Sequence, residues 1–539
     1  MLPLEPIDEH AKPAFRDVTS CVKWLNQLQL TNLNLAHGTL RAQLEEFNRC
    51  PIRAKDRLKT LESMRETIAT VQSDFAKKFY GKKLPLAEEE LTMLVALSSL
   101  WLNMLNGYLR CLQSPDAGDS SLASEEALLT HRCLLYSGLQ IGEFVRLGYE
   151  PDAASWQRFH TIYAHAEAKG LQLSPVVDKM SYADHAVSCR SVYAKTLLLH
   201  RARLTGFRRN QWQTVDRWLD KWDETYTVER QCSMSMEDAP PLAVDLAGTQ
   251  GLVAIQRATA APGMRFLAMV PLSKLIRVKT ILLQQGQSTK QLELGEELNS
   301  KDCLDLLNRL HSCWCEPHTE SLADFARENL PVVQLCSNLE SLYAHIARKP
   351  FKPPSSSIIT DKEVQRQIET FGRVLDQTDR HSLLELGFLA EEWLVEDDGL
   401  LQGHFLRKFK AGERFGLNQL VSFQKPGTPG FKLGVVALTC ITRSGHLYIA
   451  VRFLPGNPQP VVARGNTCGN LLTGAVAALV LPEMSNLRIP ASVILPRDWF
   501  QAGRVIDLSV RDNKKQSVTL GISVEKGSDF ERVSFTFNS

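Results

Sequence analysis

Residues 393–464 are a run of short apolar segments separated by turn residues, and this run constrains the fold more than any other part of the chain. Residues 417–423, 432–442 and 447–454 are rich in apolar and β-branched side chains. Ser444 and Gly445 separate the last two segments, as in a hairpin whose turn needs the positive φ of Gly. An antiparallel barrel or sandwich removes the exposed edges of so many short strands. We therefore expect a compact antiparallel β domain here.

A second β region is predicted in residues 485–537. The segments RIPASVILP, GRVIDLSVRD, KQSVTLGISVEKG and FERVSFTF are short and are separated by turn residues, which is typical of strands. Residues 512–514 are expected at a hairpin tip. This region is predicted to pack on the first β domain or to repeat it.

The N-terminal part of the chain has the hydrophobic period of helices. Leu58, Leu61, Met64 and Ile68 recur every three or four residues and predict one buried stripe. Residues 88–112 are denser in apolar side chains and predict a central helix of a bundle.

A weak duplication follows the predicted bundle. One helical hairpin is expected from residues 126–147 and 153–168, and a second from residues 182–204 and 212–226. The two could stack as a repeat with a partner-binding groove, or they could belong to an ordinary bundle. The aromatic residues near these helices are expected in the core and not in a ligand cage: Trp156, Tyr163, Trp218 and Trp222.

Bulk composition excludes several classes of protein. The 62 basic and 60 acidic residues leave a net charge of +2, which predicts no nucleic-acid or anionic-membrane surface. The 44% hydrophobic content is enough for sizeable cores, and no apolar run reaches the length of a membrane helix. The N-terminus lacks a signal-peptide core, and the 12 cysteines are scattered. We expect a cytoplasmic protein with reduced thiols and no membrane insertion.

Four phrases of the β region carry a resemblance to a known family: GLNQLVSF (416–423), FKLGVVA (431–437), LYIAVRFL (447–454) and QPVVAR (459–464). The stretch resembles the PilZ-type β-barrel of bacterial cyclic di-GMP receptors. The similarity extends to long proteobacterial proteins with an N-terminal helical region and a C-terminal PilZ-like module. The resemblance implies signalling by cyclic di-GMP binding.

With this resemblance, the predicted fold class is a multidomain α + β protein. An all-α bundle or helical-hairpin region precedes an antiparallel PilZ-like β-barrel and an additional β unit. The expected parts are a tail (1–17), a helical bundle (18–115), a helical-hairpin region (116–240), a mixed α/β connector (241–315), the barrel (316–464) with a helical insertion (355–390), and the C-terminal β unit (465–539).

The resemblance also implies two ligand elements, and both are incomplete here. In the D/NxSxxG element, Asp398 and Gly403 have the family spacing, but Leu400 replaces the Ser. No RxxxR lies near the barrel, although the spacing does occur in the helical region, at Arg53 and Arg57. Arginines nearer the barrel are spaced seven apart: Arg366, Arg373 and Arg380. The alternative interpretation is that no ligand binds here, that Asp398 is a turn residue and that Gly403 relieves crowding between strands.

A basic run with interleaved phenylalanines follows Gly403. It suits a phosphate-bearing ligand or an acidic partner, or it is simply a solvated face. The candidate ligand residues are therefore Asp398, Gly403, Arg407, Lys408, Lys410 and Arg414. Binding through them should be weak, because each charge-assisted hydrogen bond lost with the missing arginines costs on the order of 1.5–3 kcal/mol.

Motifs for catalysis and metal binding are missing. HSCWCEPH would place His311, Cys315 and His318 on one helix face, but no second cysteine pair completes a zinc site. There is no GxSxG and no HExxH. We predict a non-enzymatic regulatory protein without metal or cofactor, which senses cyclic di-GMP and acts through a protein partner. The alternative is a ligand-free interaction scaffold or chaperone-like adaptor.

Overall fold

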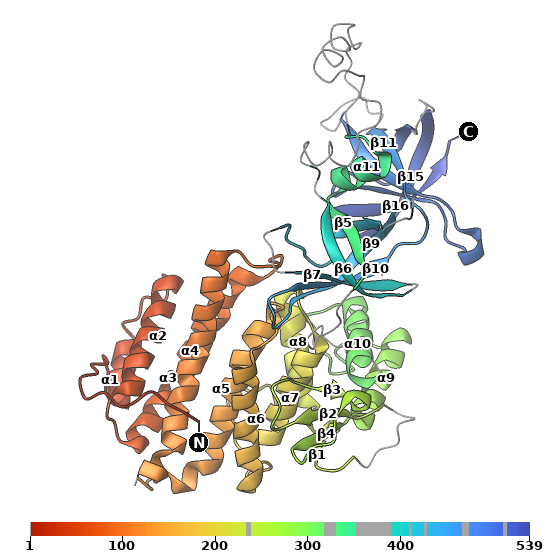
Figure 1. The fold of residues 1–539 in the computed structure, drawn as a ribbon. Coiled ribbons are helices and arrows are strands. Elements are labelled where there is room, and N and C mark those ends of the chain that lie inside the picture. Colours follow the sequence, from red (N-terminus) through yellow and green to blue (C-terminus); the bar gives the residue numbers. More distant parts are fainter. Residues whose placement is uncertain are drawn as a thin grey trace. The chain divides into compact units, whose positions relative to one another are not determined.

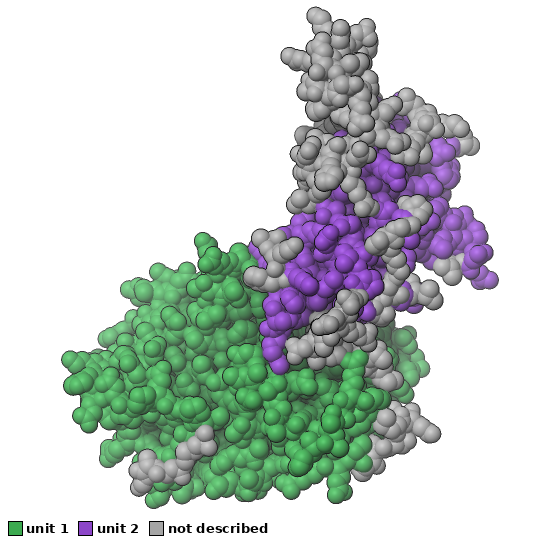
Figure 2. All heavy atoms as spheres, in the orientation of Figure 1, with its two compact units in different colours: residues 1–82, 86–324 green, residues 83–85, 325–539 purple. Residues whose placement is uncertain are grey.

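The computed structural model describes residues 2–117, 119–232, 239–316, 330–351, 388, 390–399, 401–408, 412–424, 428, 430–465, 474–509 and 515–538. They form two compact units, coloured separately in Figure 2. Unit 1 comprises residues 1–82 and 86–324, and unit 2 comprises residues 83–85 and 325–539. The predicted helical insertion at 355–390 lies almost entirely outside the described residues, as do the arginines at 366, 373 and 380.

Unit 1 is mainly helical (Figure 1). Its α-helices are α1 (Val18–Leu25), α2 (Leu33–Arg49), α3 (Ala54–Ala76), α4 (Glu88–Leu112), α5 (Glu126–Arg146), α6 (Ala153–Ala168), α7 (Cys189–Ala202), α8 (Arg209–Lys221), α9 (Val270–Gln284) and α10 (Ser300–Cys315). Short 3₁₀ turns are η1 (Lys77–Phe79), η2 (Ser114–Ala117), η3 (Ala123–Glu125), η4 (Asp223–Thr225) and η5 (Ile255–Arg257). Helices α5/α6 and α7/α8 occupy the two predicted hairpins.

Local sequence explains several helix starts. The Asp17 carboxylate accepts the Ser20 N–H at 2.9 Å and caps α1. Asn299 does the same for α10 by accepting the Asp302 N–H at 2.8 Å. These side chains satisfy amides that have no partner inside the helix.

One hydrophobic core runs through the whole of unit 1. The predicted stripe on α3 is buried, with Leu61, Met64 and Ile68 at 0% exposure. The same core continues through α5, α7 and α10. It includes the four aromatic residues predicted to be core: Trp156, Tyr163, Trp218 and Trp222. The three helical and mixed regions expected from the sequence are therefore one compact body in the structure.

A small antiparallel sheet completes unit 1, in the order β1-β4-β2-β3. Its strands are β1 (Thr227–Glu229), β2 (Leu242–Asp245), β3 (Val253–Ala254) and β4 (Met264–Ala268). The sequence predicted a mixed α/β connector from residue 241 and missed β1, which is only three residues long.

The first barrel of unit 2 is closed and antiparallel, in the order β10-β7-β6-β5-β8-β9. Its strands are β5 (Val332–Ser337), β6 (Glu391–Asp398), β7 (Gln402–Arg407), β8 (Leu420–Gln424), β9 (Lys432–Ile441) and β10 (Leu447–Phe453). The predicted β9–β10 hairpin is confirmed: Thr442 N–H donates to the His446 carbonyl at 2.9 Å, and Gly445 has φ +81°.

The second barrel is also closed and antiparallel, in the order β11-β12-β13-β16-β15-β14. Its strands are β11 (Gln459–Gly465), β12 (Ala475–Leu481), β13 (Ser492–Pro496), β14 (Val505–Ser509), β15 (Lys515–Lys526) and β16 (Phe530–Phe537), with the 3₁₀ turn η6 (Ser485–Leu487). The predicted boundary after residue 464 was wrong for β11, because this strand pairs with β12 and β14 and not with the first barrel. The predicted hairpin tip at 512–514 lies outside the described residues.

Helix α11 (Leu339–Ala347) joins the two barrels of unit 2. Leu342 on this helix shares a buried cluster with Leu420 and Leu433 of the first barrel and with Leu479 and Ile494 of the second. The predicted fold class, a helical region followed by a β-barrel and a further β unit, is confirmed, and the further β unit is itself a barrel.

Candidate functional site

The incomplete ligand element lies where β6 meets β7. Asp398 pairs with Gly403 in this ladder, and the side chain of Asp398 lies outside what the structure describes. A Cβ at Gly403 would lie 2.6 Å from the ring of Phe453 and 3.1 Å from that of Phe405. Glycine is therefore needed here for packing, whether or not its backbone also meets a ligand.

Arg407 is a buried residue of the first barrel and not a surface cation. Its side chain is 5% exposed and forms an ion pair with Glu391. The guanidinium also lies over the rings of Trp393 at 5.4 Å and Phe415 at 5.7 Å. The guanidinium charge is therefore paired with a carboxylate, and the group packs against two neighbouring aromatic rings.

Of the remaining predicted basic residues, the structure describes Lys408 and Arg414. Lys408 is exposed at the end of β7, and Lys410 lies outside the described residues. Arg414 donates from Nε and Nη2 to the Lys83 carbonyl at 3.2 and 2.9 Å. Of the predicted set, Arg414 is the residue that lines a large cavity.

This cavity has a volume of about 720 Å³ and lies within unit 2. It is bounded by the start of α11, the segment before β8, the start of β12 and the β15–β16 turn. The lining residues are Lys83, Ser337, Asn338, Leu339, Glu340, Phe351, Glu413, Arg414, Gln419, Ala475, Val476, Ala477, Pro496 and Asp529. Both barrels and α11 therefore contribute to one cavity.

The N-terminus of α11 opens onto the cavity. Asn338 is the N-cap, and its Oδ1 accepts the Glu340 N–H at 3.1 Å. The backbone of Asn338 has φ 73° and ψ 126°, a strained conformation for a residue with a side chain. The dipole of a helix and the orientation of its first amides favour an anion at the helix N-terminus. Strain at such a position is typical of a functional site.

The charged lining is mixed. Lys83 and Arg414 are cationic, and three carboxyl groups face them: Glu340, Glu413 and Asp529. Burial raises the pKa of the Asp529 carboxyl, and the Leu420 N–H, which it accepts at 2.9 Å, opposes this shift. The cavity thus offers both cations for phosphate and carboxylates for N–H donors.

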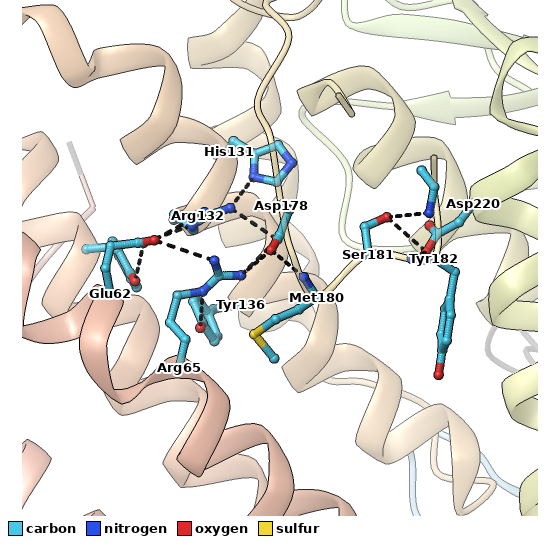
Figure 3. A network of polar contacts seen from close by, with 12 residues as sticks. Glu62, Arg65, His131, Arg132, Tyr136, Asp178, Met180, Ser181, Tyr182 and Asp220 are labelled. Atoms are coloured by element: carbon cyan, nitrogen blue, oxygen red, sulfur yellow. Dashed lines mark hydrogen bonds and ion pairs between the residues drawn. The ribbon is translucent and has the colours of Figure 1, made fainter. Parts of the chain in front are cut away.

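A second polar cluster lies in unit 1 (Figure 3). The Asp178 carboxylate accepts from Arg65 Nη2 at 2.8 and 2.9 Å and from Arg132 Nη1 at 3.1 Å. Arg132 Nε also donates to Glu62 at 2.9 Å. Burial raises the pKa of Asp178, but the two guanidinium groups outweigh it and hold this pKa below its ordinary value.

Several of these residues line a smaller cavity of about 290 Å³ in unit 1. Several of its other charged lining residues also form ion pairs: Lys195 Nζ lies 2.8 Å from Asp216 and 2.7 Å from Asp220. Arg146 Nη1 lies 3.1 Å from Glu143. Because these charges neutralise one another, the cluster serves the fold of the helical unit.

The weighed zinc residues have other partners. His311 Nε2 lies 3.0 Å from Ser273 Oγ and 3.1 Å from Arg277 Nε. Burial raises the pKa of the Cys315 thiol to about 12, and His318 lies outside the described residues. Across the described ranges, no group of three His, Cys, Asp or Glu residues is arranged to hold a metal ion. Among the same residues, no helix has the length and apolarity needed to cross a membrane.

The helical region and the second barrel each match the model of a known protein family. Residues 19–231 match the family described as "Cyclic-di-GMP receptor FimW, N-terminal domain", and residues 472–537 match "FimW C-terminal beta-barrel domain". The chain therefore belongs to the FimW family.

A curated relative and two solved structures show how far the likeness extends. The cyclic-di-GMP receptor FimW of Pseudomonas aeruginosa is 21% identical over 92% of this chain and 86% of its own length. A structure titled as a complex of K. pneumonia MrkH with c-di-GMP is 7% identical and covers 28% of this chain and 75% of its own, with a TM-score of 0.14. A second MrkH structure, titled as a c-di-GMP-dependent transcription regulatory factor, is 8% identical and covers 41% and 91%, with a TM-score of 0.12. These two TM-scores are too low to support any argument about this chain.

The predicted resemblance to cyclic di-GMP receptors is thus confirmed at the level of the family. Sequence reasoning missed most of the cavity residues, because Lys83, Asn338 and Asp529 are far apart in the chain. The one signal that pointed to the cavity was the basic run ending at Arg414.

Proposed function

We propose that this protein is a receptor for cyclic di-GMP that binds the dinucleotide in the cavity of unit 2. The observation that carries the proposal is the cavity itself, which combines cations, a helix N-terminus and carboxylates in a chain of the FimW family. Its relative in Pseudomonas aeruginosa is named a cyclic-di-GMP receptor and aligns over nearly the whole chain.

The size of the cavity supports this ligand. Small-molecule sites in proteins occupy roughly 300–1,000 Å³. The cavity, at about 720 Å³, lies in the upper part of that range. A cyclic dinucleotide, with two bases and a closed sugar-phosphate ring, is a large ligand of this kind, so we expect a single molecule per chain.

We assign the two phosphates to the helix N-terminus and the two cationic side chains that line the cavity. The first amides of α11, behind Asn338, suit one phosphate. The guanidinium of Arg414 and the ammonium of Lys83 suit the other, because both line the cavity. Arg414 is already oriented by its two bonds to the Lys83 carbonyl.

The guanine bases are assigned to the carboxylates and to Phe351. A guanine presents N–H donors on its base-pairing edge, and a carboxylate offers only acceptors. Glu340 and Asp529 line the cavity and can accept these donors. The ring of Phe351 lies edge-on to Tyr343 at 5.7 Å and offers a face for a base.

The sequence-derived ligand set is revised accordingly. Arg414 is kept as a ligand residue, and Arg407 is assigned to the fold because it is buried against Trp393. Asp398 and Gly403 stay a prediction from the family motif, and Lys408 and Lys410 stay a prediction from the basic run. We also keep the predictions that the receptor is non-enzymatic, acts through a protein partner and binds no nucleic acid.

The test is calorimetric titration of the purified full chain with cyclic di-GMP. Arg414→Ala should weaken binding by roughly ten- to a hundredfold, as expected for one charge-assisted interaction of on the order of 1.5–3 kcal/mol. Arg53→Ala is the control, because Arg53 belongs to the RxxxR spacing at the start of α3 and is 86% exposed in unit 1. Equal affinity of the two variants would refute the site. No binding at millimolar ligand would refute the receptor function and favour the scaffold alternative.

A further inference from the structure

Residues 83–85 leave the helical unit in space although they lie within it in sequence. They join the compact unit that contains the barrels, whereas residue 82 and residue 86 belong to the helical unit. We call these three residues the strap.

Backbone hydrogen bonds attach the strap to Phe415 of unit 2. Leu84 N–H donates to the Phe415 carbonyl at 2.8 Å, and Phe415 N–H donates to the Leu84 carbonyl at 2.7 Å. Both side chains are buried, with Leu84 at 2% and Phe415 at 1% exposure. The Arg414 side chain adds its two bonds to the Lys83 carbonyl. The attachment is therefore specific in register and orientation.

The side chain of Lys83 extends from the strap along the wall of the cavity. A Cβ at Gly416 would lie 3.2 Å from Lys83 Cγ, so the aliphatic stem of the lysine runs close over this glycine. The residue lines the cavity together with Arg414 and Asp529. In the part of the chain that the structure describes, no acidic group lies within 4 Å of the Lys83 ammonium. The Lys83 charge acts on the Asp529 carboxyl and lowers its pKa, without a direct ion pair, so the ammonium can still meet an anion in the cavity.

We propose that the strap is part of the ligand site and that an anionic dinucleotide fastens it to the barrel by bonding Lys83 and Arg414 together. This inference rests on the proposed function and adds its regulation. A ligand that binds only the docked strap favours that state by mass action. Strap docking and ligand binding must then support each other equally.

The flanking residues give the strap a route to the helical unit. Lys82 Nζ lies 2.8 Å from Glu90, in the first turn of α4. Leu86 N–H donates to the Tyr149 hydroxyl at 3.0 Å, just after α5. Fastening the strap therefore restrains the two residues that flank it. Lys82 contacts the first turn of α4, and Leu86 contacts Tyr149 just after α5. This covalent path is how the receptor would report its ligand.

Hydrogen exchange of the full chain, followed by mass spectrometry, tests the strap. With cyclic di-GMP at about a hundred times its Kd, exchange at Leu84 and Phe415 should slow by up to a hundredfold where strap opening controls it. Lys83→Ala keeps the backbone bonds and should weaken ligand binding by about tenfold and reduce this protection. The matched control Lys82→Ala, which loses only the Glu90 pair, should keep both.

The outcomes separate the two proposals. If cyclic di-GMP binds without slowing exchange at Leu84 and Phe415, the strap proposal is refuted and the receptor function stands. Normal affinity of Lys83→Ala overturns it as well. No binding by the wild-type chain at millimolar cyclic di-GMP overturns the proposed function, and the strap with it. Circular dichroism of each variant establishes that it is folded.

Discussion

Replacing Arg407 by methionine should destabilise the barrel unit far more than a surface change would. Methionine keeps an apolar stem but removes the ion pair with Glu391 and the contacts over Trp393 and Phe415. Removing one partner of a buried pair costs about 3–5 kcal/mol. Glu391 is 19% exposed and still accepts the Glu413 N–H at 2.8 Å. We therefore expect the lower end, about 3 kcal/mol.

Native-state hydrogen exchange of the β7 and β10 amides measures this loss. At 1.4 kcal/mol per factor of ten, exchange by unfolding of the unit should become roughly a hundred times faster. The control is Arg452→Met on β10, because Arg452 is 51% exposed and its pair with Glu525 should contribute less than about 1 kcal/mol. A change under 1 kcal/mol for Arg407→Met, combined with weaker cyclic di-GMP binding, would refute this reasoning and return Arg407 to the ligand set.

Three further predictions concern stability. Asp178→Asn removes the carboxylate between Arg65 and Arg132 and should lower the free energy of unfolding of the helical unit by about 3 kcal/mol. The loss is measured as faster hydrogen exchange of α3 and α5 amides, and a loss under about 1 kcal/mol would contradict the prediction. Because folding lowers the pKa of Asp178, the stability it contributes is complete above the unfolded pKa of about 3.9 and is lost as the pH falls through the folded pKa. The melting temperature of the wild type should therefore fall more between pH 6 and pH 3 than that of the variant. Gly403→Val should destabilise the first barrel in urea unfolding, whereas Gly430→Val, which has open space around its Cβ, should not; equal effects would oppose the packing argument.

The fold could be predicted where the signal is local. Helix α4 was predicted with its observed bounds, because residues 88–112 are dense in apolar side chains. The β9–β10 hairpin was predicted because Gly445 marks its turn. The closure of the barrels was not, because pairing between distant strands leaves no local pattern. Strand β5, for example, pairs with β6 more than fifty residues later.

The site was harder to predict for the same reason. The basic run was predicted as one surface, but Arg407 at the end of β7 lies in packed surroundings, whereas Arg414 lines the cavity. Lys83 comes from the helical part of the sequence, and its place beside Arg414 depends on a backbone bridge to Phe415. Sequence spacing carries no information on such a contact.

Titration of the wild-type chain and of Arg414→Glu with cyclic di-GMP tests the central claim most directly. The account predicts saturable binding of one ligand per chain and a loss of at least tenfold in affinity when the cavity arginine is reversed, with the variant still folded by circular dichroism. Absence of binding at millimolar ligand, or an affinity unchanged in Arg414→Glu, would contradict it.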